Sequence, residues 1–196
     1  KAHEGARLHG PDDLEILGLS YDSRQAHRGH LFAALHGAKQ DGLEFVKSAR
    51  RKGAIAVLSD RTPSLEIPWI EVQDSRAALA DLAAAYFERP AEKLRLAGVT
   101  GTNGKTTTAF LIDAALRENS KTTGLLGTVE TRIAGRPKSA SLTTPESLDL
   151  QALLREMVDE GVTHATLEVS SHALVQERVR GLAFRAAVFT NLTRDH

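Results

Sequence analysis

Residues 98–108 of the chain read GVTGTNGKTTT. The stretch starts as an apolar strand, passes through a loop with two glycines, and opens a helix at Lys105. Glycines let backbone N–H groups turn toward an anion, and the start of a helix adds unpaired N–H groups and a favourable dipole. Lys105 offers a charge to the β- and γ-phosphates, and Thr106 offers a hydroxyl to Mg²⁺. The stretch therefore predicts a site for a nucleoside triphosphate, which we take to be ATP with Mg²⁺, formed by Thr100, Gly101, Thr102, Asn103, Gly104, Lys105 and Thr106.

The match to the strict phosphate-loop pattern is incomplete. The pattern G-x-x-x-x-G-K-[ST] requires glycine at position 99, where this chain has Val99. The alternative is an ordinary glycine-rich turn with a solvated lysine. The order of strand, loop and helix favours phosphate binding.

The sequence after residue 94 alternates between strand and helix patterns. We expect strands at 96–100 and 123–129, two buried strands at 164–169 and 185–190, and a helix at 105–118 that buries Phe110, Leu111, Ala114 and Ala115. A second helix is predicted to start with Thr144 as its cap and Pro145 at its first position, to bury Leu150, Leu153, Leu154, Met157 and Val158, and to end at Gly161. This alternation predicts an α/β fold with a mainly parallel, doubly wound sheet.

A smaller α/β domain is predicted before that sheet. We expect strands at 30–35, 54–59 and 69–72, a helix at 43–52, and another helix that starts at Asp74 or Ser75. Residues 89–94 contain Pro90 and charged residues between a helix and a strand, which is typical of a linker. The predicted organisation is therefore a domain at 1–88, a linker at 89–94 and a phosphate-loop domain at 95–196.

A carboxylate is predicted to lie near the phosphate loop. The strand at 164–169 ends with Glu168, and ligands of open parallel sheets bind beyond the carboxyl ends of the strands. Glu168 is then placed to hold Mg²⁺ opposite Thr106. The next strand leads to the same edge and is followed by Asn191, Thr193, Asp195 and His196. The alternative for Glu168 is a charge at a strand end that meets water.

Composition excludes some classes of function. Acidic and basic residues number 25 each, which leaves no net charge to attract nucleic acid or an anionic membrane. The chain has no cysteine, which excludes disulfides and thiolate metal sites. It has no signal-peptide pattern and no apolar run long enough to span a bilayer. We therefore expect a cytoplasmic protein, and we interpret the chain as a piece of a longer one.

Several strings together resemble one family of enzymes. They are the loop at 98–108, LTTPE at 142–146, EVSSHAL at 168–174, NLTRDH at 191–196, DSR at 22–24 and DGLEF at 41–45. This combination resembles the Mur ligases, which build the bacterial cell-wall precursor peptide on UDP-N-acetylmuramic acid. Within the family it is most similar to the members that add the third amino acid. The resemblance runs through the whole chain in order.

The resemblance implies roles for individual residues. It implies that Ser23 and Arg24, with the loop at 37–41, contact the uridine diphosphate. It assigns the muramoyl-peptide to Thr143, Thr144, Ser170, Gln176 and Arg178. It places one Mg²⁺ on Thr106 and Glu168 and a second on His196, so that Lys105, Glu168 and His196 serve catalysis. The implied reaction converts the D-glutamate carboxylate into an acyl phosphate, which the amino group of the incoming amino acid attacks.

One departure and several alternatives remain at this point. Some relatives have asparagine before the Thr-Thr pair, where this chain has Leu142. Another ATP-dependent amide ligase, of the folylpolyglutamate or cyanophycin synthetase type, would share the phosphate loop. A phosphate-loop kinase or nucleic-acid motor fits the charge balance less well. A binding module without catalysis is the third alternative, and we expect the chain alone to bind its substrates without ligating them. The sequence does not decide whether diaminopimelate, lysine or ornithine is added.

Overall fold

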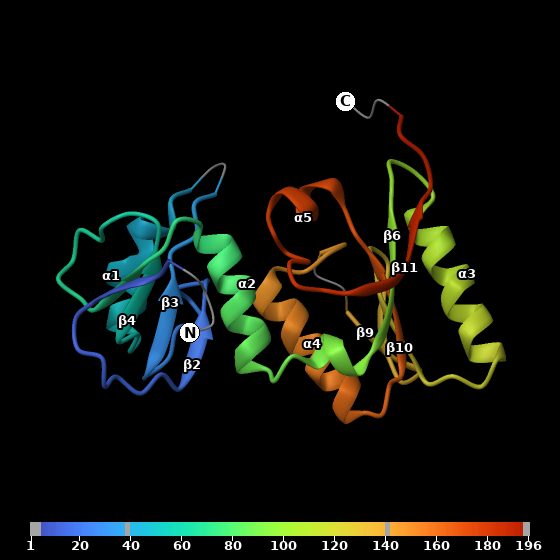
Figure 1. Ribbon diagram of the computed structural model, residues 1–196, viewed down its shortest axis with the longest axis horizontal. Helices are drawn as coiled ribbons and strands as arrows, with labels where there is room; N and C mark the ends of the chain where they lie inside the picture. Colours follow the sequence, from blue (N-terminus) through green and yellow to red (C-terminus); the bar gives the residue numbers. More distant parts are fainter. Residues whose placement is uncertain (1–4, 38–39, 140–141, 194–196) are drawn as a thin grey trace. The chain divides into compact units, whose positions relative to one another are not determined.

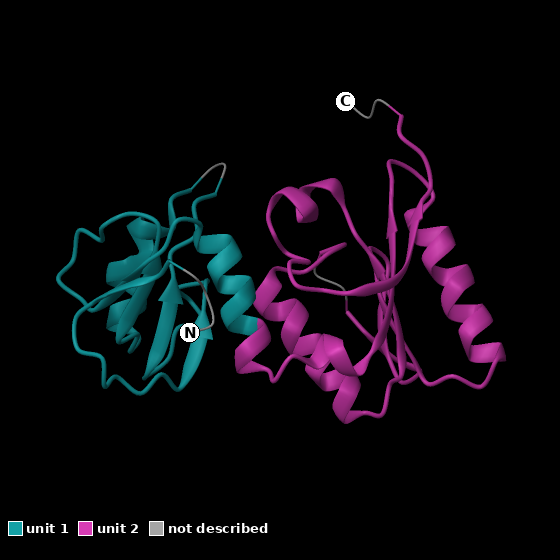
Figure 2. Ribbon diagram, in the orientation of Figure 1, with its two compact units in different colours: residues 1–83 teal, residues 84–196 magenta. Residues whose placement is uncertain are grey.

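The computed structural model describes residues 5–37, 40–139 and 142–193. The chain divides into two compact units, residues 1–83 and 84–196, which Figure 2 shows in different colours. Each unit has its own sheet and its own hydrophobic core. Among the described residues, no helix is long and apolar enough to cross a bilayer.

The first unit contains a five-stranded sheet with the order β1-β5-β4-β3-β2. Its strands are β1 (Arg7–His9), β2 (Gly18–Ser20), β3 (His30–Ala33), β4 (Ala56–Ser59) and β5 (Trp69–Glu71). Strands β2 to β5 are parallel, and β1 joins the edge antiparallel to β5. The helical elements are the 3-10 helix η1 (Gly42–Phe45) and the helices α1 (Val46–Arg51) and α2 (Ser75–Tyr86), of which Figure 1 labels α1 and α2.

The predicted elements of the first unit are confirmed with shorter bounds. The three predicted strands are β3, β4 and β5, and the predicted helix at 43–52 is a 3-10 turn followed by α1. Asp74 starts α2 as expected, because its Oδ1 accepts the backbone N–H groups of Arg76 (2.8 Å) and Ala77 (3.0 Å). Strands β1 and β2 were not predicted.

The second unit contains a six-stranded sheet with the order β11-β6-β10-β7-β8-β9. Its strands are β6 (Arg95–Thr100), β7 (Thr123–Leu126), β8 (Thr131–Ile133), β9 (Arg136–Lys138), β10 (His164–Glu168) and β11 (Phe184–Phe189). The first four strands in that order are parallel, and β8 and β9 continue the sheet as an antiparallel hairpin. The α/β fold with a mainly parallel sheet is therefore confirmed, and the hairpin is an addition that was not predicted.

Helices cover both faces of this sheet. Figure 1 shows α3 (Lys105–Glu118) on one side and α4 (Ser147–Asp159) on the other, with the short α5 (Ser171–Val175) after β10. The core on the α4 side includes Leu154, Met157 and Leu167. The core on the α3 side includes Ala109 with Val99 and Leu125. Strands buried on two faces consist of continuous apolar runs, which is why β6 and β10 were visible in the sequence.

The prediction for the buried face of α3 is right for Phe110, which packs against the core, and wrong for Leu111 and Ala115. The bounds of the helix are as expected, but Leu111 is 66% exposed and Ala115 is also exposed. The buried positions are Ala109 and Asp113, which are four residues apart and therefore lie on one face. Asp113 is a charged residue at a core position, paired with Arg132 at 2.7 Å. A search for apolar periodicity alone therefore misses Asp113.

Two further predictions need correction. Thr144 does not cap α4, because Glu146 occupies the cap position and accepts the N–H of Ser147. Strand β11 is not buried: most of its residues are exposed, since β11 lies at the edge of the sheet and is paired only with β6 among the described residues.

The segment at 89–94 contains the 3-10 helix η2 (Pro90–Lys93). Ala91 and Leu94 belong to the core of the second unit, on the α4 side. The division between the compact units falls after Ala83, inside α2.

Candidate functional site

The phosphate loop joins β6 to α3 and requires glycine at two positions. Gly101 has φ +131° and Gly104, which caps α3, has φ +81°. Both angles lie where residues with a Cβ are strained. At Gly101 there is also no room, because a Cβ would lie 2.2 Å from Thr190 Oγ1. The two glycines therefore allow the turn and the close approach of the residues after β11.

The residues after β11 hold this loop by hydrogen bonds. Thr102 N donates to Asn191 O (3.0 Å), and the Thr102 hydroxyl and the backbone of Thr193 bond to each other in both directions (3.0 and 3.1 Å). Asn103 N donates to Asn191 Oδ1 (3.1 Å), and Thr190 Oγ1 donates to Asn103 O (2.6 Å). The N–H groups of residues 102 and 103 thus have protein acceptors. The amides that could bind an anion are therefore those of Gly104 and the first turn of α3, which are fewer than those of the whole loop.

Lys105 is anchored inside the loop. Its ammonium donates to Gly101 O (2.8 Å) and Thr102 O (2.9 Å). An ammonium has three N–H groups. The two carbonyls fix its position and leave one N–H to donate to an anion at the start of α3.

Glu168 faces the loop from the end of β10. Its side chain is 1% exposed, so the alternative that it simply meets water is wrong. Thr106 Oγ1 and Thr128 Oγ1 donate to Oε2 (2.9 and 3.1 Å), and Thr128 N donates to Oε1 (3.0 Å). Gly127 makes room, because a Cβ there would lie 2.3 Å from Oε1. The structure brings Thr106 and Glu168 together as the sequence predicted.

The donor set around Glu168 fits a hard divalent cation. Carboxylate and hydroxyl oxygens are the ligands that Mg²⁺ prefers. The side chain of Glu168 accepts from uncharged donors, the hydroxyls of Thr106 and Thr128 and the N–H of Thr128, and a buried carboxylate without a cation is costly. In the part of the chain that the structure describes, no three or more His, Cys, Asp and Glu side chains are grouped so that they could hold a metal ion by themselves. His196, predicted to bind a second Mg²⁺, lies outside the described residues.

Three of the five residues assigned to the muramoyl-peptide, Thr144, Gln176 and Arg178, are joined by hydrogen bonds that reach the backbone of Glu168. Thr144 is 2% exposed, and its hydroxyl donates to Glu168 O (2.8 Å) and accepts from Ser170 N (3.1 Å). Arg178 donates to Thr144 O (2.7 Å) and to Gln176 Oε1 (2.6 Å), and lies 3.7 Å from buried Glu146. The strand–loop junctions around Glu168 are therefore fixed by these side chains.

The remaining two are more accessible. Thr143 Oγ1 lies 2.9 Å from Thr128 Oγ1, and Ser170 caps α5 by accepting the N–H of Ala173 (3.2 Å). Sequence reasoning missed Thr128 and Glu146. The Gly-Thr pair directly after the apolar run of β7 was the available signal for Thr128, at the same sheet edge as Glu168.

The first unit brings its predicted residues to one pocket. Tyr21, Asp22, Ser23, Arg24, Gln40 and Phe45 line a space of about 420 Å³. Arg24 folds back on Asp22, with both carboxylate oxygens within 3.0 Å of its nitrogens. Hydrogen bonding from Arg24 lowers the pKa of Asp22. Ser23 lines the pocket although the residue is only 8% exposed.

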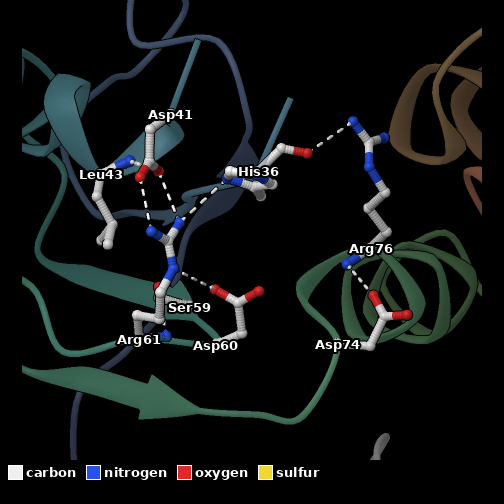
Figure 3. A network of polar contacts seen from close by, with 8 residues as sticks. All are labelled: His36, Asp41, Leu43, Ser59, Asp60, Arg61, Asp74 and Arg76. Atoms are coloured by element: carbon white, nitrogen blue, oxygen red, sulfur yellow. Dashed lines mark hydrogen bonds and ion pairs between the residues drawn. The ribbon is translucent and has the colours of Figure 1, made fainter. Parts of the chain in front are cut away.

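A polar network supports the loop that carries Gln40. Arg61 donates to both oxygens of Asp41 (2.7 and 2.8 Å) and contacts His36 Nδ1 at 3.4 Å, as Figure 3 shows. Arg76 donates to His36 O at 3.4 Å from the start of α2. The hydrogen bonds from Arg61 lower the pKa of Asp41. Both ends of the loop are therefore tied to the body of the unit.

Two family models match this chain. The model of the Mur ligase middle domain matches residues 99–196, and that of the Mur ligase family, catalytic domain, matches residues 15–87. The chain belongs to the Mur ligase family. The resemblance that the sequence suggested is therefore confirmed, and the matches cover both the loop at 98–108 and the pocket around Ser23.

Individual relatives agree with the family models. The UDP-N-acetylmuramoyl-L-alanyl-D-glutamate–2,6-diaminopimelate ligase of Solibacter usitatus is 52% identical over 93% of this chain, which spans 37% of that relative. A solved structure with the same enzyme name is 33% identical over 92% of this chain and 37% of its own, with a TM-score of 0.81. The MurF ligase of Thermotoga maritima in complex with ADP is 26% identical over 82% of this chain and 34% of its own, with a TM-score of 0.54.

Proposed function

We propose that the chain is part of an ATP-dependent, cytoplasmic ligase of peptidoglycan precursor synthesis. The reaction adds the third amino acid to UDP-N-acetylmuramoyl-L-alanyl-D-glutamate. The observation that supports this best is buried Glu168, bonded to Thr106 at the start of α3, in a chain 52% identical to a relative named for this reaction. A diaminopimelate ligase is favoured by the name of that relative.

The chemistry has two steps. A carboxylate oxygen of D-glutamate attacks the γ-phosphorus of ATP, the bond from that phosphorus to the β–γ bridging oxygen breaks, and ADP leaves. The amino nitrogen of the incoming amino acid then attacks the acyl carbon, loses a proton and displaces phosphate, which leaves an amide. The first step brings two anions together, so it depends on groups that stabilise negative charge.

The residues of the second unit supply that stabilisation. Lys105 directs its remaining N–H at the triphosphate, and the N–H groups at the start of α3 bind phosphate oxygens. Mg²⁺ held by Thr106 and Glu168 would offset the repulsion between carboxylate and triphosphate. His196 is proposed to hold a second Mg²⁺.

The two units are proposed to bind different parts of the muramoyl substrate. The pocket at Ser23 and Arg24, with the loop at 37–41, binds the uridine diphosphate. Thr143, Ser170 and Gln176 contact the muramoyl-peptide. We propose that Thr144 and Arg178 act mainly by fixing these residues, because their polar groups already bond to each other and to the backbone of Glu168.

A phosphate-release assay tests the proposal. The full-length protein that carries this chain is mixed with ATP, Mg²⁺ and UDP-N-acetylmuramoyl-L-alanyl-D-glutamate, and 2,6-diaminopimelate, lysine or ornithine is added in turn. We expect release that requires the dipeptide substrate and is fastest with diaminopimelate. Release with a folate substrate instead would support a ligase of the folylpolyglutamate type.

The chain alone is proposed to bind without turnover, since it spans 37% of the relative described above. Calorimetry of the 196-residue chain should show binding of the nucleotide-sugar substrate without substrate-stimulated ATP hydrolysis. Turnover by the chain alone at the rate of the full-length protein would contradict this part of the proposal.

A further inference from the structure

The side chain of Asn191 pairs with the backbone of a residue 88 positions earlier. Asn191 Oδ1 accepts the N–H of Asn103 (3.1 Å), and Asn191 Nδ2 donates to Asn103 O (3.0 Å). One carboxamide thus satisfies both backbone groups of a single loop residue, as a neighbouring strand would do. The main chain of Asn191 also accepts the N–H of Thr102 (3.0 Å).

This pairing determines how the loop presents its next amide. The C=O of Asn103 and the N–H of Gly104 belong to one planar trans peptide unit, so they point in opposite directions. Asn191 Nδ2 and Thr190 Oγ1 both bond to Asn103 O and hold it toward the end of β11. The N–H of Gly104 is therefore directed away from β11.

Glycine at position 104 makes such an external constraint necessary. Gly104 has φ +81° and no Cβ contact closer than 4.0 Å, so the loop itself does little to restrict rotation of this peptide. The residue before it, Asn103, is exposed. Hydrogen bonds from the residues after β11 thus fix a peptide unit that would otherwise exchange between orientations.

We infer that Asn191 is a positioning residue of the phosphate loop, which fixes the peptide between Asn103 and Gly104 in the orientation that accepts an anion. The inference rests on the proposed function, in which this loop binds the triphosphate. It adds a role for the asparagine after β11, which acts through the backbone of the loop and does not touch the nucleotide.

Two variants and one control test the inference. Asn191→Ala removes both hydrogen bonds, and Asn191→Asp keeps the size of the side chain but places a second acceptor against Asn103 O. Leu192→Ala is the matched control, because Leu192 is the next residue and its side chain is 83% exposed. The measurements are amide hydrogen exchange at Asn103, the dissociation constant for ATP with Mg²⁺, and that for UDP-N-acetylmuramoyl-L-alanyl-D-glutamate.

We expect exchange at Asn103 to accelerate by about tenfold or more in both Asn191 variants. The dissociation constant for ATP should rise by about tenfold, which corresponds to one lost charge-assisted contact. Affinity for the muramoyl substrate should stay unchanged, which excludes general unfolding, and Leu192→Ala should match the wild type in every measurement.

Unchanged exchange at Asn103 in both variants would overturn the inference, and so would faster exchange with unchanged ATP affinity. A wild-type protein that binds the muramoyl substrate but not ATP would refute the phosphate-loop proposal instead. In that case the exchange measurement still decides whether Asn191 holds the loop.

Discussion

The two units hold their loops by different physical means. In the second unit the loop at 101–104 and Glu168 are held by hydrogen bonds and not by an ion pair between described residues, and Glu168 is 1% exposed. In the first unit the loop at 36–41 is held by the ion pair of Asp41 and Arg61, whose side chains are 25% and 46% exposed. Exposed ion pairs contribute little to stability and are screened by salt, whereas a buried carboxylate is costly without a cation. The ion pair of Asp41 and Arg61 therefore favours one conformation of the loop in the first unit. In the second unit a bound cation would stabilise the buried carboxylate of Glu168.

Lys105→Met should produce the largest effect. The substitution keeps a long side chain but removes the charge for the phosphates and the bonds to Gly101 O and Thr102 O. We expect ligase activity of the full-length protein to fall by about 100-fold or more. Phosphate release measures the effect, and Lys121→Met, an exposed lysine just after the far end of α3, is the control. Equal activity of the two variants would mean that the charge of Lys105 does not contribute to the reaction.

Arg61→Met should produce a moderate effect confined to the first unit. Without the guanidinium, Asp41 and His36 lose their common partner and the loop carrying Gln40 samples more conformations. We expect the dissociation constant for the muramoyl substrate to rise by about threefold at low salt, and the melting temperature to stay nearly the same.

Salt provides the sharper form of this test. High salt should raise the dissociation constant of the wild type for the muramoyl substrate toward that of the Arg61→Met variant, because salt screens the exposed ion pair of Asp41 and Arg61. Arg51→Met, an exposed arginine on α1, removes the same charge from the unit and serves as the control. If both variants lose affinity equally, the effect comes from net charge and not from the loop.

A smaller effect is expected from acid in the first unit. Burial, followed by the charge of His27, lowers the pKa of His30, whose Nδ1 is buried without a hydrogen-bond partner in the described residues. The unfolded chain therefore binds a proton at His30 more readily than the folded chain does. The contribution of neutral His30 to the free energy of unfolding is present above about pH 6.5 and is lost as the pH falls through the pKa of His30 in the folded state.

The melting temperature of the protein should therefore decrease between pH 7.5 and pH 5.5, and His30→Gln should reduce that decrease. Calorimetric scans at the two pH values measure both. An identical pH dependence in the variant would show that His30 is not the group responsible.

Much of the second unit could be predicted because its signals are local. The bounds of α3 and the meeting of Thr106 with Glu168 follow from apolar runs and from the rule that parallel strands end at one edge. The contacts of Asn191 could not be predicted, since residues 88 positions apart share no period. The burial of Asp113 was missed because its partner Arg132 lies on another element.

The first unit shows the same limit at its loops. Its central strands could be predicted from continuous apolar runs, but the pairing of Asp41 with Arg61 depends on a contact between loops 20 residues apart. The short strands β1 and β2 and the hairpin of β8 and β9 are defined by their neighbours, not by their own sequence. His196 lies outside the described residues, and its role stays a prediction.

The central claim is that Glu168 and the phosphate loop share a magnesium ion bound to the nucleotide. The most direct measurement is titration of ATP into the wild type and Glu168→Gln, with Mg²⁺ and with a chelator. The amide keeps the size of the side chain, and its oxygen can still accept from the hydroxyls of Thr106 and Thr128, whereas the N–H of Thr128 loses its acceptor. We predict that Mg²⁺ strengthens ATP binding by about tenfold in the wild type and has almost no effect in the variant. The same strengthening by Mg²⁺ in both proteins would contradict the account.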